Sequence, residues 1–354
     1  MGEGSSIAAA RPQIQLDGAA ATSLTQGLIR VRIREDQKGL YNCEATFGNW
    51  GPAGGSVGYL YFGRDTLEFG KDFAVMLEGV ALFAGRISAL EATFPDGRSP
   101  EVTVLAEDRS QDLRMTRRTR SFANMSDAQV MQQVASEHGL TPDVDVTGPT
   151  HQLLAQLNQS DLAFLRQRAR AVDAEVWVEG RTLSVKAHAR RDGGRVRLGY
   201  GNELLEFTVL ADLADQRSSV TVTGWDVAGK QSLSEGADDT ALGAELGNGD
   251  SGASILRTAL AERKEVVSHA VPLGSAEARA RAEALFRGRA RRFVRGHGIA
   301  QTAAGLRVGA TVQLDGLGPL FSGDYYVAEA THRFDAEQGM RSEFTVERPA
   351  LGRP

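Results

Sequence analysis

The chain opens with a long stretch in which apolar and polar positions alternate. Residues 28–36, LIRVRIRED, alternate apolar and charged side chains, which is the period of a strand with one buried face. Residues 57–108 continue with short runs of the same kind, and the sequence PDG at 95–97 is typical of a hairpin turn. Strands this short and this closely spaced predict a small β-barrel or sandwich over residues 13–107.

The period changes to that of helices after residue 108. Ser126 followed three residues later by Gln129 is a capping box, and apolar residues at helical spacing follow it. Residues 156–185, QLNQSDLAFLRQRARAVDAEVWVEGRTLSV, predict a helix capped by Ser160 and then a β-hairpin. The segment therefore reads as a mixed α/β module.

The last part of the chain returns to strands in two pieces, residues 203–230 and residues 305–348. Between them, residues 231–262 are rich in Gly, Ser, Asp and Ala, which favours a mobile loop or an insertion that orders on assembly. Residues 275–294, SAEARARAEALFRGRARRFV, predict a helix with Ser275 as its N-cap.

These patterns predict a β-rich α+β fold, in which a mixed α/β module separates two β-barrel-like domains. The expected boundaries are 1–108 for the first β-barrel-like domain, 109–202 for the α/β module, 203–230 plus 295–354 for the second β-barrel-like domain, and 231–294 for a flexible insertion loop and an arginine-rich helix.

Composition narrows the class of protein. The 354 residues are 42% hydrophobic and 24% charged with a net charge of −5, as in ordinary globular proteins. Aromatic residues make up 6%, which argues against nucleic-acid binding by base stacking. The single cysteine, Cys43, excludes a disulfide framework within the chain. Residues 1–13 lack the basic and apolar regions of a signal peptide, and no apolar run is long enough to span a membrane. With a single cysteine, folding in a reducing cytosol is the favoured interpretation.

Two short motifs suggest chemistry that their surroundings do not support. Residues 224–231, GWDVAGKQ, fit the spacing of a phosphate loop, but Gln231 replaces the Ser or Thr that would hold magnesium. Residues 248–254, NGDSGAS, hold the Gly-Asp-Ser-Gly found around some protease nucleophiles, yet no histidine lies upstream of Ser251 in a matching context. A turn and a polar loop are the favoured interpretations.

Metal and cofactor sites are not indicated either. No two of the six histidines lie three or four residues apart, although convergence in space stays open. Paired carboxylates for glycoside cleavage leave no local signature in a sequence. We therefore expect no catalytic, cofactor-binding or metal residue. The histidines are His138, His151, His188, His269, His297 and His332.

Arginines gather in two places. Five lie between residues 109 and 120, and six lie in the predicted helix at 275–294. The simpler interpretation is a solvated helix face and a polar strand edge. The alternative is a charged surface that meets an acidic surface on a neighbouring subunit or partner. The candidate interface residues are Arg114, Arg117, Arg118, Arg120, Arg287, Arg291 and Arg292.

Four segments together resemble the late control D proteins of contractile phage tails, which are similar to the N-terminal hub part of the type VI secretion spike, the valine-glycine repeat protein G. The segments are LFAGRISALEA at 82–92, with Gly85 expected between two strands, LRMTRRTRSFANMSDAQVMQQVASEHGL at 113–140, the 156–185 stretch with Ser160, Asp161, Phe164 and Leu165, and LRVGATVQLDGLGPLFSGDYYVAEATHRFD at 306–335 with Gly309, Gly323, Tyr326, Val327 and His332.

Two features depart from the family pattern. Asp173 stands where the family usually has glycine, at the turn from helix to strand. Aspartate tolerates a positive φ better than most residues, so the turn is compatible with it. The segment 231–262 has no clear counterpart.

The resemblance implies a structural role without catalysis. It implies a homotrimer whose six barrel-like domains form a ring, which adapts a sixfold inner tube to a threefold spike in a baseplate. The expected partners are the inner tube protein, other baseplate proteins and, because the chain ends soon after its last strands, a separate spike or needle protein, with no nucleic acid. The alternatives are a hydrolase carried by such a particle and a receptor- or carbohydrate-binding protein. The last would need exposed aromatics, but Trp50, Trp177 and Trp225 are far apart, and the latter two are expected in the core.

Overall fold

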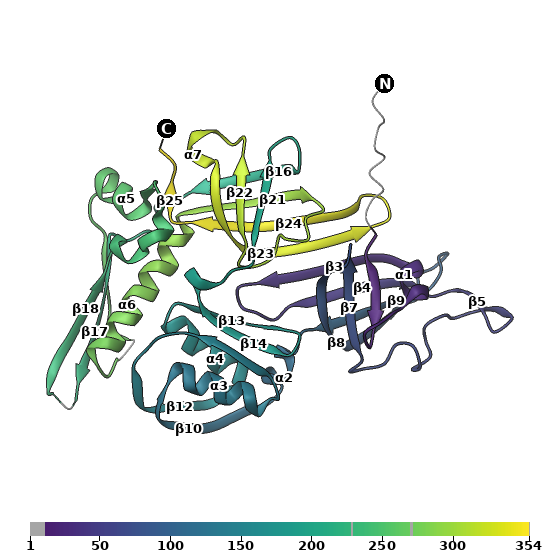
Figure 1. Cartoon of the computed structure of the whole chain (residues 1–354), viewed down its shortest axis with the longest axis horizontal. Helices are drawn as coiled ribbons and strands as arrows, with labels where there is room; N and C mark the ends of the chain where they lie inside the picture. The colour runs from purple at the N-terminus through teal and green to yellow at the C-terminus, as the bar shows by residue number, and fades with distance from the viewer. Residues whose placement is uncertain (1–10, 228, 270–271, 354) are drawn as a thin grey trace.

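The computed structural model describes residues 11–227, 229–269 and 272–353, and four hydrophobic cores divide them into four units (Figure 1). Large antiparallel sheets dominate, so the predicted β-rich α+β fold is confirmed. Residues 1–10 lie outside the described part. They begin the first predicted domain, and the expectation about a signal peptide rests on them. No helix among the described residues is long and apolar enough to span a membrane.

The first β unit folds around a core that includes Ile33, Phe47 and Val104. The PDG turn joins β8 to β9 as an antiparallel hairpin, as predicted. The unit consists of β1 (Gln13–Leu16), β2 (Ala19–Ala20), α1 (Thr22–Gly27), β3 (Leu28–Asp36), β4 (Asn42–Gly48), β5 (Gly51–Ala53), β6 (Ser56–Gly58), β7 (Asp72–Leu77), β8 (Val80–Thr93) and β9 (Glu101–Glu107).

The α/β unit confirms both predicted helix starts. Ser126 and Gln129 form a capping box at α3, and the Ser160 hydroxyl accepts the backbone N–H of Ala163 at the start of α4. The elements are α2 (Ser110–Arg114), β10 (Arg117–Ser126), α3 (Asp127–Glu137), β11 (Thr141–Asp145), β12 (Thr150–Ser160), α4 (Asp161–Ala171), β13 (Ala174–Glu179), β14 (Thr182–Ala187) and the 3-10 turn η1 (His188–Arg190).

The second β unit is joined to the first by a shared sheet. Strand β23 pairs with β22 over its first residues, then shifts register between Val327 and Glu329, and from there pairs antiparallel with β3 of the first unit. A β-bulge bends a strand and changes its direction, which explains how β23 pairs with strands of both β units. The elements are β15 (Arg195–Gly199), β16 (Leu204–Ala211), β21 (Val294–Gln301), β22 (Thr311–Asp315), α7 (Gly318–Phe321), β23 (Gly323–Asp335), β24 (Gly339–Arg348) and β25 (Ala350–Leu351).

The fourth unit, which we call the arm, lies beside the second β unit and α/β unit (Figure 1). Helix α6 packs on one face of the sheet β18–β17–β20, and Val222, Ala282 and Phe286 lie in their shared core. The elements are β17 (Ser219–Asp226), β18 (Gln231–Ala237), η2 (Asp239–Leu246), β19 (Asp250–Ser251), α5 (Gly252–Leu260), β20 (Lys264–Val267), α6 (Ser275–Ala290) and η3 (Arg291–Phe293).

The arm corrects several expectations. Residues 231–262 carry β18, η2, β19 and α5, so the segment has regular structure, while its expected mobility or ordering on assembly stays a prediction. Strand β17, within the expected 203–230 part of the second barrel, pairs in the arm sheet instead. Helix α6 ends at Ala290, and its N-cap is Gly274 rather than Ser275. Where independent folding domains begin and end stays a prediction.

Two expectations about single residues are also wrong. Gly85 lies inside β8 rather than between strands, and a Cβ there would stand 2.3 Å from the backbone oxygen of Glu107. Glycine is therefore required by the close approach of two strands, not by a turn. Trp225 was expected in the core, but its residue is 54% exposed because β17 turns that side chain to the uncovered face of the arm.

Candidate functional site at the junction of the units

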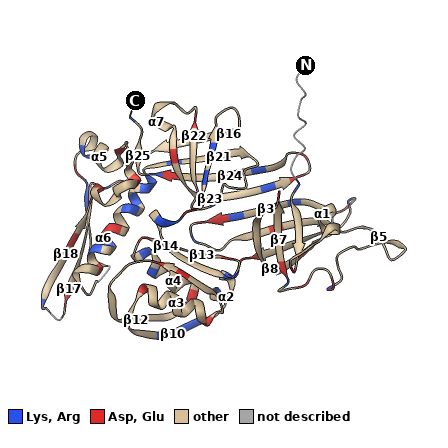
Figure 2. Ribbon diagram, in the orientation of Figure 1, with Lys and Arg blue, Asp and Glu red and all other residues tan. Residues whose placement is uncertain are grey.

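Three clusters of arginine and carboxylate, each with a buried carboxylate or arginine, lie where the units meet. Each contains one arginine, Arg191, Arg307 or Arg291, whose carboxylate partners come from a different stretch of the chain. Figure 2 shows basic and acidic positions along α6 and on the strands around the junction. Removing one partner from a buried ion pair is costly, so such clusters define one relative placement of the elements that supply them.

The Arg191 cluster joins three units. The guanidinium of Arg191 donates to Glu175 Oε2 at 2.7 Å and to the Tyr41 hydroxyl at 2.5 Å. The same carboxylate accepts the hydroxyl of Tyr326 at 2.7 Å and is bonded to His188 at 2.9 Å. Tyr41 belongs to the first β unit and Tyr326 to the second, while the other three residues belong to the α/β unit.

The environment keeps Glu175 ionised. Burial alone would raise the pKa of this carboxyl, but the hydrogen bond from His188, the charge of Arg191 and the hydrogen bond from Tyr326 outweigh it and lower the pKa to about 2. The guanidinium of Arg191 lies over the ring of Trp177, 4.1 Å from its centroid, so its remaining surface is covered by an aromatic face. A carboxylate held this way serves as a fixed anchor rather than as a proton donor.

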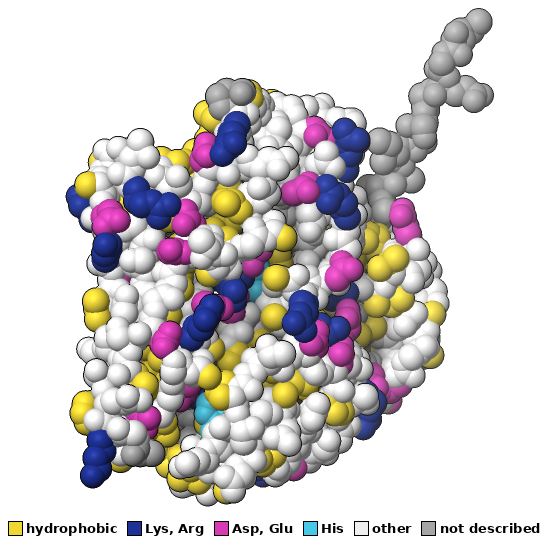
Figure 3. Space-filling model, turned by 60° about the vertical axis from the view of Figure 1, so that its left-hand side comes forward, with side chains coloured by type: hydrophobic (Ala, Val, Ile, Leu, Met, Phe, Trp, Pro, Cys, Tyr) yellow, Lys and Arg dark blue, Asp and Glu magenta, His cyan; other side chains and the backbone are white. Residues whose placement is uncertain are grey.

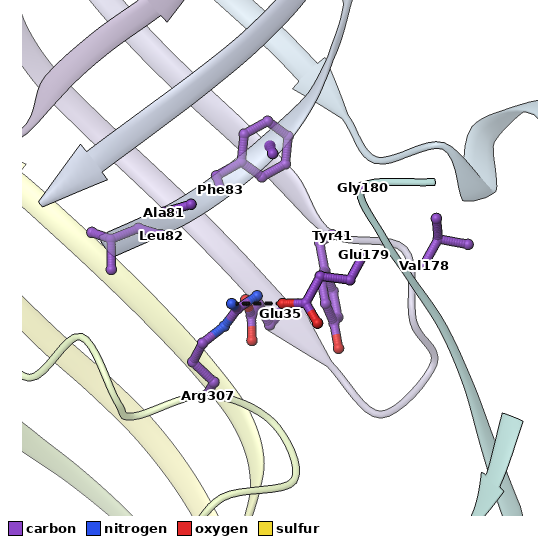
Figure 4. Close-up of a pocket in the computed structure, with 10 residues that line it drawn as sticks. Glu35, Tyr41, Ala81, Leu82, Phe83, Val178, Glu179, Gly180 and Arg307 are labelled. Carbon is purple, nitrogen blue, oxygen red and sulfur yellow. Dashed lines mark hydrogen bonds and ion pairs between the residues drawn. The ribbon is translucent and has the colours of Figure 1, made fainter. Parts of the chain in front are cut away.

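The Arg307 cluster also draws on three units (Figure 4). Arg307, in the loop before β22, donates to Glu35 of β3 through Nε at 2.8 Å and through Nη2 at 2.5 Å. Its Nη1 reaches Glu179, at the end of β13, at 3.0 Å. The second oxygen of Glu35 accepts the backbone N–H of Val308 at 3.2 Å. The buried Glu35 carboxylate therefore ties the first β unit to the second.

His332 lies close to this cluster, buried in β23, with Nδ1 2.9 Å from the hydroxyl of Ser342. Burial and the nearby charge of Arg307 lower the pKa of His332 to about 4. The imidazole is therefore neutral in the folded protein at neutral pH. This residue carries part of the C-terminal resemblance, and its position in the structure is that of a core histidine.

We expect the folded state to lose stability as the pH falls from about 6.5 to about 4. The folded pKa of His332 is depressed, so the unfolded chain binds the proton first, and the contribution is fully present only above the unfolded value. The loss attributable to this group is ~3 kcal/mol. Urea unfolding of the native chain and of His332→Gln at several pH values measures it as the difference between the two curves. Parallel curves would contradict the assignment.

The Arg291 cluster holds the arm to the α/β unit. The guanidinium forms two hydrogen bonds with Asp173, at 2.6 and 2.7 Å, and two with Glu245, at 2.6 and 2.7 Å. Asp173 has a φ of 55°, so the predicted tolerance of a left-handed turn by aspartate is confirmed. Because this position holds Asp173 instead of glycine, it supplies the carboxylate that binds Arg291. Burial lowers the pKa of Arg291, but Glu245 and Asp173 outweigh this effect, and the net shift is upward.

The seven candidate interface arginines have different surroundings. Arg118 and Arg120 both contact the buried carboxylate of Asp161, at 3.2 and 2.9 Å. Arg291 is buried in its cluster, and Arg287 lies 3.7 Å from the same Asp173. The remaining three, Arg114, Arg117 and Arg292, are exposed. Whether any of the seven meets a neighbouring subunit stays a prediction.

Ser251, the serine of the Gly-Asp-Ser-Gly motif, has a structural position. It is buried at the N-cap of α5, where its hydroxyl accepts the backbone N–H of Ser254 at 3.0 Å and donates to Asp239 at 3.0 Å. Arg257 binds the same carboxylate at 2.7 Å. The Ser251 hydroxyl is therefore hydrogen-bonded both as donor and as acceptor, and neither partner is the histidine base that a serine nucleophile requires. The expected polar loop is wrong, because the motif starts a helix.

We expect Ser251→Ala to lower the free energy of unfolding by ~1–2 kcal/mol, because the helix loses its cap and Asp239 loses a donor. Thermal or urea unfolding measures this change. Ser232→Ala, at an exposed position of β18, is the matched control and should change little. Equal stability of both variants would show that the cap contributes nothing.

The remaining candidate chemistry is not assembled in the described residues. There, no group of three or more His, Cys, Asp or Glu is placed to hold a metal ion. Lys230 of the phosphate-loop-like motif lies in the turn between β17 and β18, and a strand rather than a helix follows it; residue 228 of that motif lies outside the described part. A phosphate loop requires a helix N-terminus at this place.

A cluster of exposed aromatic rings lies at one end of the first β unit. Trp50 packs edge-on against Tyr59 with centroids 5.2 Å apart, and Tyr59 contacts Phe62 at 4.8 Å. Phe94 completes the cluster, 5.8 Å from Phe62, and all four residues are exposed. Sequence reasoning missed this surface because it compared only the three tryptophans. Exposed aromatic clusters of this kind mark binding surfaces.

The family model of the Alg8 N-terminal domain matches residues 77–336, which is well over half of the chain. The chain belongs to the Alg8 N-terminal domain family. The match runs from the last residue of β7 through the arm to the end of β23, so it includes all three ionic clusters except Glu35 and Tyr41. No curated protein sequence matches this member of the family.

Solved structures share the fold over nearly the whole chain. The 43 kDa tail protein of prophage MuSo2 from Shewanella oneidensis is 13% identical with a TM-score of 0.69, covering 96% of this chain and 99% of its own. A tail protein from Neisseria meningitidis is 13% identical with a TM-score of 0.68, covering 96% of each chain. An E. coli component of the type VI secretion system is 11% identical with a TM-score of 0.60, covering 97% of this chain and 79% of its own. At these identities the likeness establishes the fold.

Proposed function

We propose that the chain is a structural subunit of the baseplate hub in a contractile phage tail or contractile injection system. The observation that carries the proposal is the fold shared with the MuSo2 tail protein over 96% of this chain and 99% of that one. The resemblance to late control D proteins supports the narrower assignment to the hub. The proposal assigns no reaction to the chain.

In this role the chain is a homotrimer that joins a sixfold inner tube to a threefold spike. Each subunit has two β units, so three subunits supply six of them around a central axis. An adaptor of this kind depends on a fixed angle between its two β units. The shared pairing of β3 with β23 and the buried Arg191 and Arg307 clusters support such a fixed angle.

The proposed partners are the inner tube protein on one side, a spike protein on the other and neighbouring baseplate proteins, with assembly in the cytoplasm. The decisive experiment purifies particles from cells that carry a tagged chain and determines their structure by electron microscopy. We expect density for three copies at the junction of tube and spike. Particles without this chain at that junction would overturn the proposal.

The aromatic cluster of Trp50, Tyr59, Phe62 and Phe94 favours a second candidate, a receptor- or carbohydrate-binding role within such a particle. Trp50→Ala separates the two candidates. A binding role predicts that particles with this variant assemble normally but adhere less to target cells. A purely structural role predicts unchanged adhesion of every particle that assembles.

A further inference from the structure

A groove of about 630 Å³ runs across the junction of the units. Its walls come from the turn after β3, helix α4, strand β13, the end of α6 and the strands β21, β23 and β24. Figure 3 shows charged side chains gathered around a recess on the face where the arm and the α/β unit meet. This volume lies in the range of ligand-binding clefts.

The charge of the groove is opposite to that of the chain. Seven arginines and lysines and four carboxylates line it, a difference of +3, whereas the whole chain has a net charge of −5. All four carboxylates have polar partners within the chain, among them Arg291 for Asp173 and Arg191 for Glu175. Two of the seven cations, Arg289 and Arg291, also form ion pairs.

Five cations of the groove therefore form no ion pair within the described residues, although the charges of Asp36 and Asp108 act on one of them, Arg166. Arg166, on α4, is half-buried, and its Nε is buried without a hydrogen-bond partner. The other four are exposed and form no ion pair with any carboxylate of the described residues; they are Lys38, Arg170, Arg292 and Arg295. They lie on four different units, so a single anionic group could not contact all of them without spanning the groove.

We propose that this groove binds an extended acidic segment of a partner protein. Carboxylates match the donor geometry of arginine, and repeated carboxylates along a chain match cations distributed over several units. Between the cations the floor is aliphatic, with Val176, Leu285 and Ala328, which suits apolar side chains between the acidic ones. No Phe, Tyr or Trp lines the groove, and its one imidazole, His188, is bonded to Glu175, which disfavours nucleic acid. The inference goes beyond the hub role and does not depend on it.

Such a segment would contact the first β unit, the α/β unit, the arm and the second β unit at once. It would add charge pairs to elements that the three ionic clusters already hold in place. Binding would therefore stabilise the relative placement of the units, because a ligand of the folded arrangement shifts the equilibrium toward it. The partner of the groove is thus expected to strengthen the assembled state of the chain.

The test uses the full chain and a short fluorescein-labelled peptide of the repeat Glu-Ala-Glu-Leu, followed by fluorescence anisotropy. The matched peptide has Gln in place of each Glu. We expect the Glu peptide to bind at least about tenfold more tightly than the Gln peptide, with an advantage that shrinks as salt is added. Equal binding of the two peptides, or tighter binding of a single-stranded oligonucleotide, would overturn the proposal.

Charge reversal locates the site. Arg292→Glu combined with Arg295→Glu, both exposed and unpaired, should weaken binding of the Glu peptide by about tenfold or more. The control combines Arg98→Glu with Lys230→Glu, which removes the same charge at exposed turns that do not line the groove and should change affinity by less than about twofold. Arg170→Ala probes the opposite wall without charge reversal and should also weaken binding. Equal weakening by the control pair would show that net charge, not the groove, binds the peptide.

Discussion

Replacing Arg191 by methionine is expected to lower the free energy of unfolding by about 3–5 kcal/mol, the range found when one partner of a buried ion pair is removed. Methionine approximates the aliphatic part of arginine, so the packing against Trp177 is largely kept. The decrease in the free energy of unfolding therefore reports the removal of the charge rather than a change in packing. Urea unfolding at neutral pH measures it, with the midpoint and the slope determined together.

The effect is large because Glu175 and Tyr41 lose a shared donor in a buried place. Glu175 keeps His188 and Tyr326, but a carboxylate with fewer compensating groups no longer has the low pKa that Arg191 helps to maintain. The Tyr41 hydroxyl loses the guanidinium to which it is bonded. Since these residues come from different units, we expect the variant to weaken the junction as well as the fold.

The control is an ion pair of similar length on the surface. Arg197 lies 2.5 Å from Asp315, but its side chain is 74% exposed, so water solvates both charges after substitution. Arg197→Met is expected to change stability little. If the Arg191 and Arg197 variants lost equal stability, the burial of the Arg191 cluster would not be the source of its contribution. A change in slope for Arg191→Met alone would indicate that the units separate before they unfold.

Local signals in the sequence were enough for the α/β unit. Ser126 with Gln129 and Ser160 cap their helices as predicted, because a cap depends on residues only a few positions apart. The alternating pattern of LIRVRIRED likewise predicted β3 and its buried face. What the pattern could not predict is that β3 has a partner near the other end of the chain, since Glu35 and Arg307 are 272 positions apart.

The arm was misjudged because its elements depend on one another. The segment 231–262 is poor in large apolar residues, yet Leu242 and Leu256 are buried. Leu242 lies in the core formed by β17 and α6, so tertiary packing rather than local propensity stabilises the short elements. One local signal was available: Ser251 followed by GASILRTAL is an N-cap before helix-forming residues.

The ionic junction combines predictable and unpredictable parts. The arginine-rich character of residues 275–294 is visible in the sequence, and Arg291 does meet acidic residues. Those residues, Asp173 and Glu245, belong to the same chain, whereas the prediction placed the acidic surface on a neighbour. Composition gives the sign of a charge, but only the fold determines which charge lies opposite.

Gly39→Ala is expected to lower the free energy of unfolding by about 2–5 kcal/mol, from backbone strain and from steric overlap together. Gly39 has a φ of +66°, and a Cβ on it would stand 1.8 Å from the backbone oxygen of Val176. That oxygen belongs to β13, so the turn after β3 would have to move away from the α/β unit. The movement would also disturb the hydrogen bond from Arg166 to the Gly39 carbonyl and the nearby Tyr41.

Gly97→Ala separates strain from overlap. Gly97 has a φ of +68°, close to that of Gly39, but no atom lies within 4 Å of its Cβ position. It should therefore lose only the ~1–2 kcal/mol of left-handed backbone strain. Comparing the two variants by urea unfolding gives the cost of separating the first β unit from β13. Equal losses would mean that the turn after β3 yields freely, and that the two units are held by their ionic clusters rather than by close backbone contact.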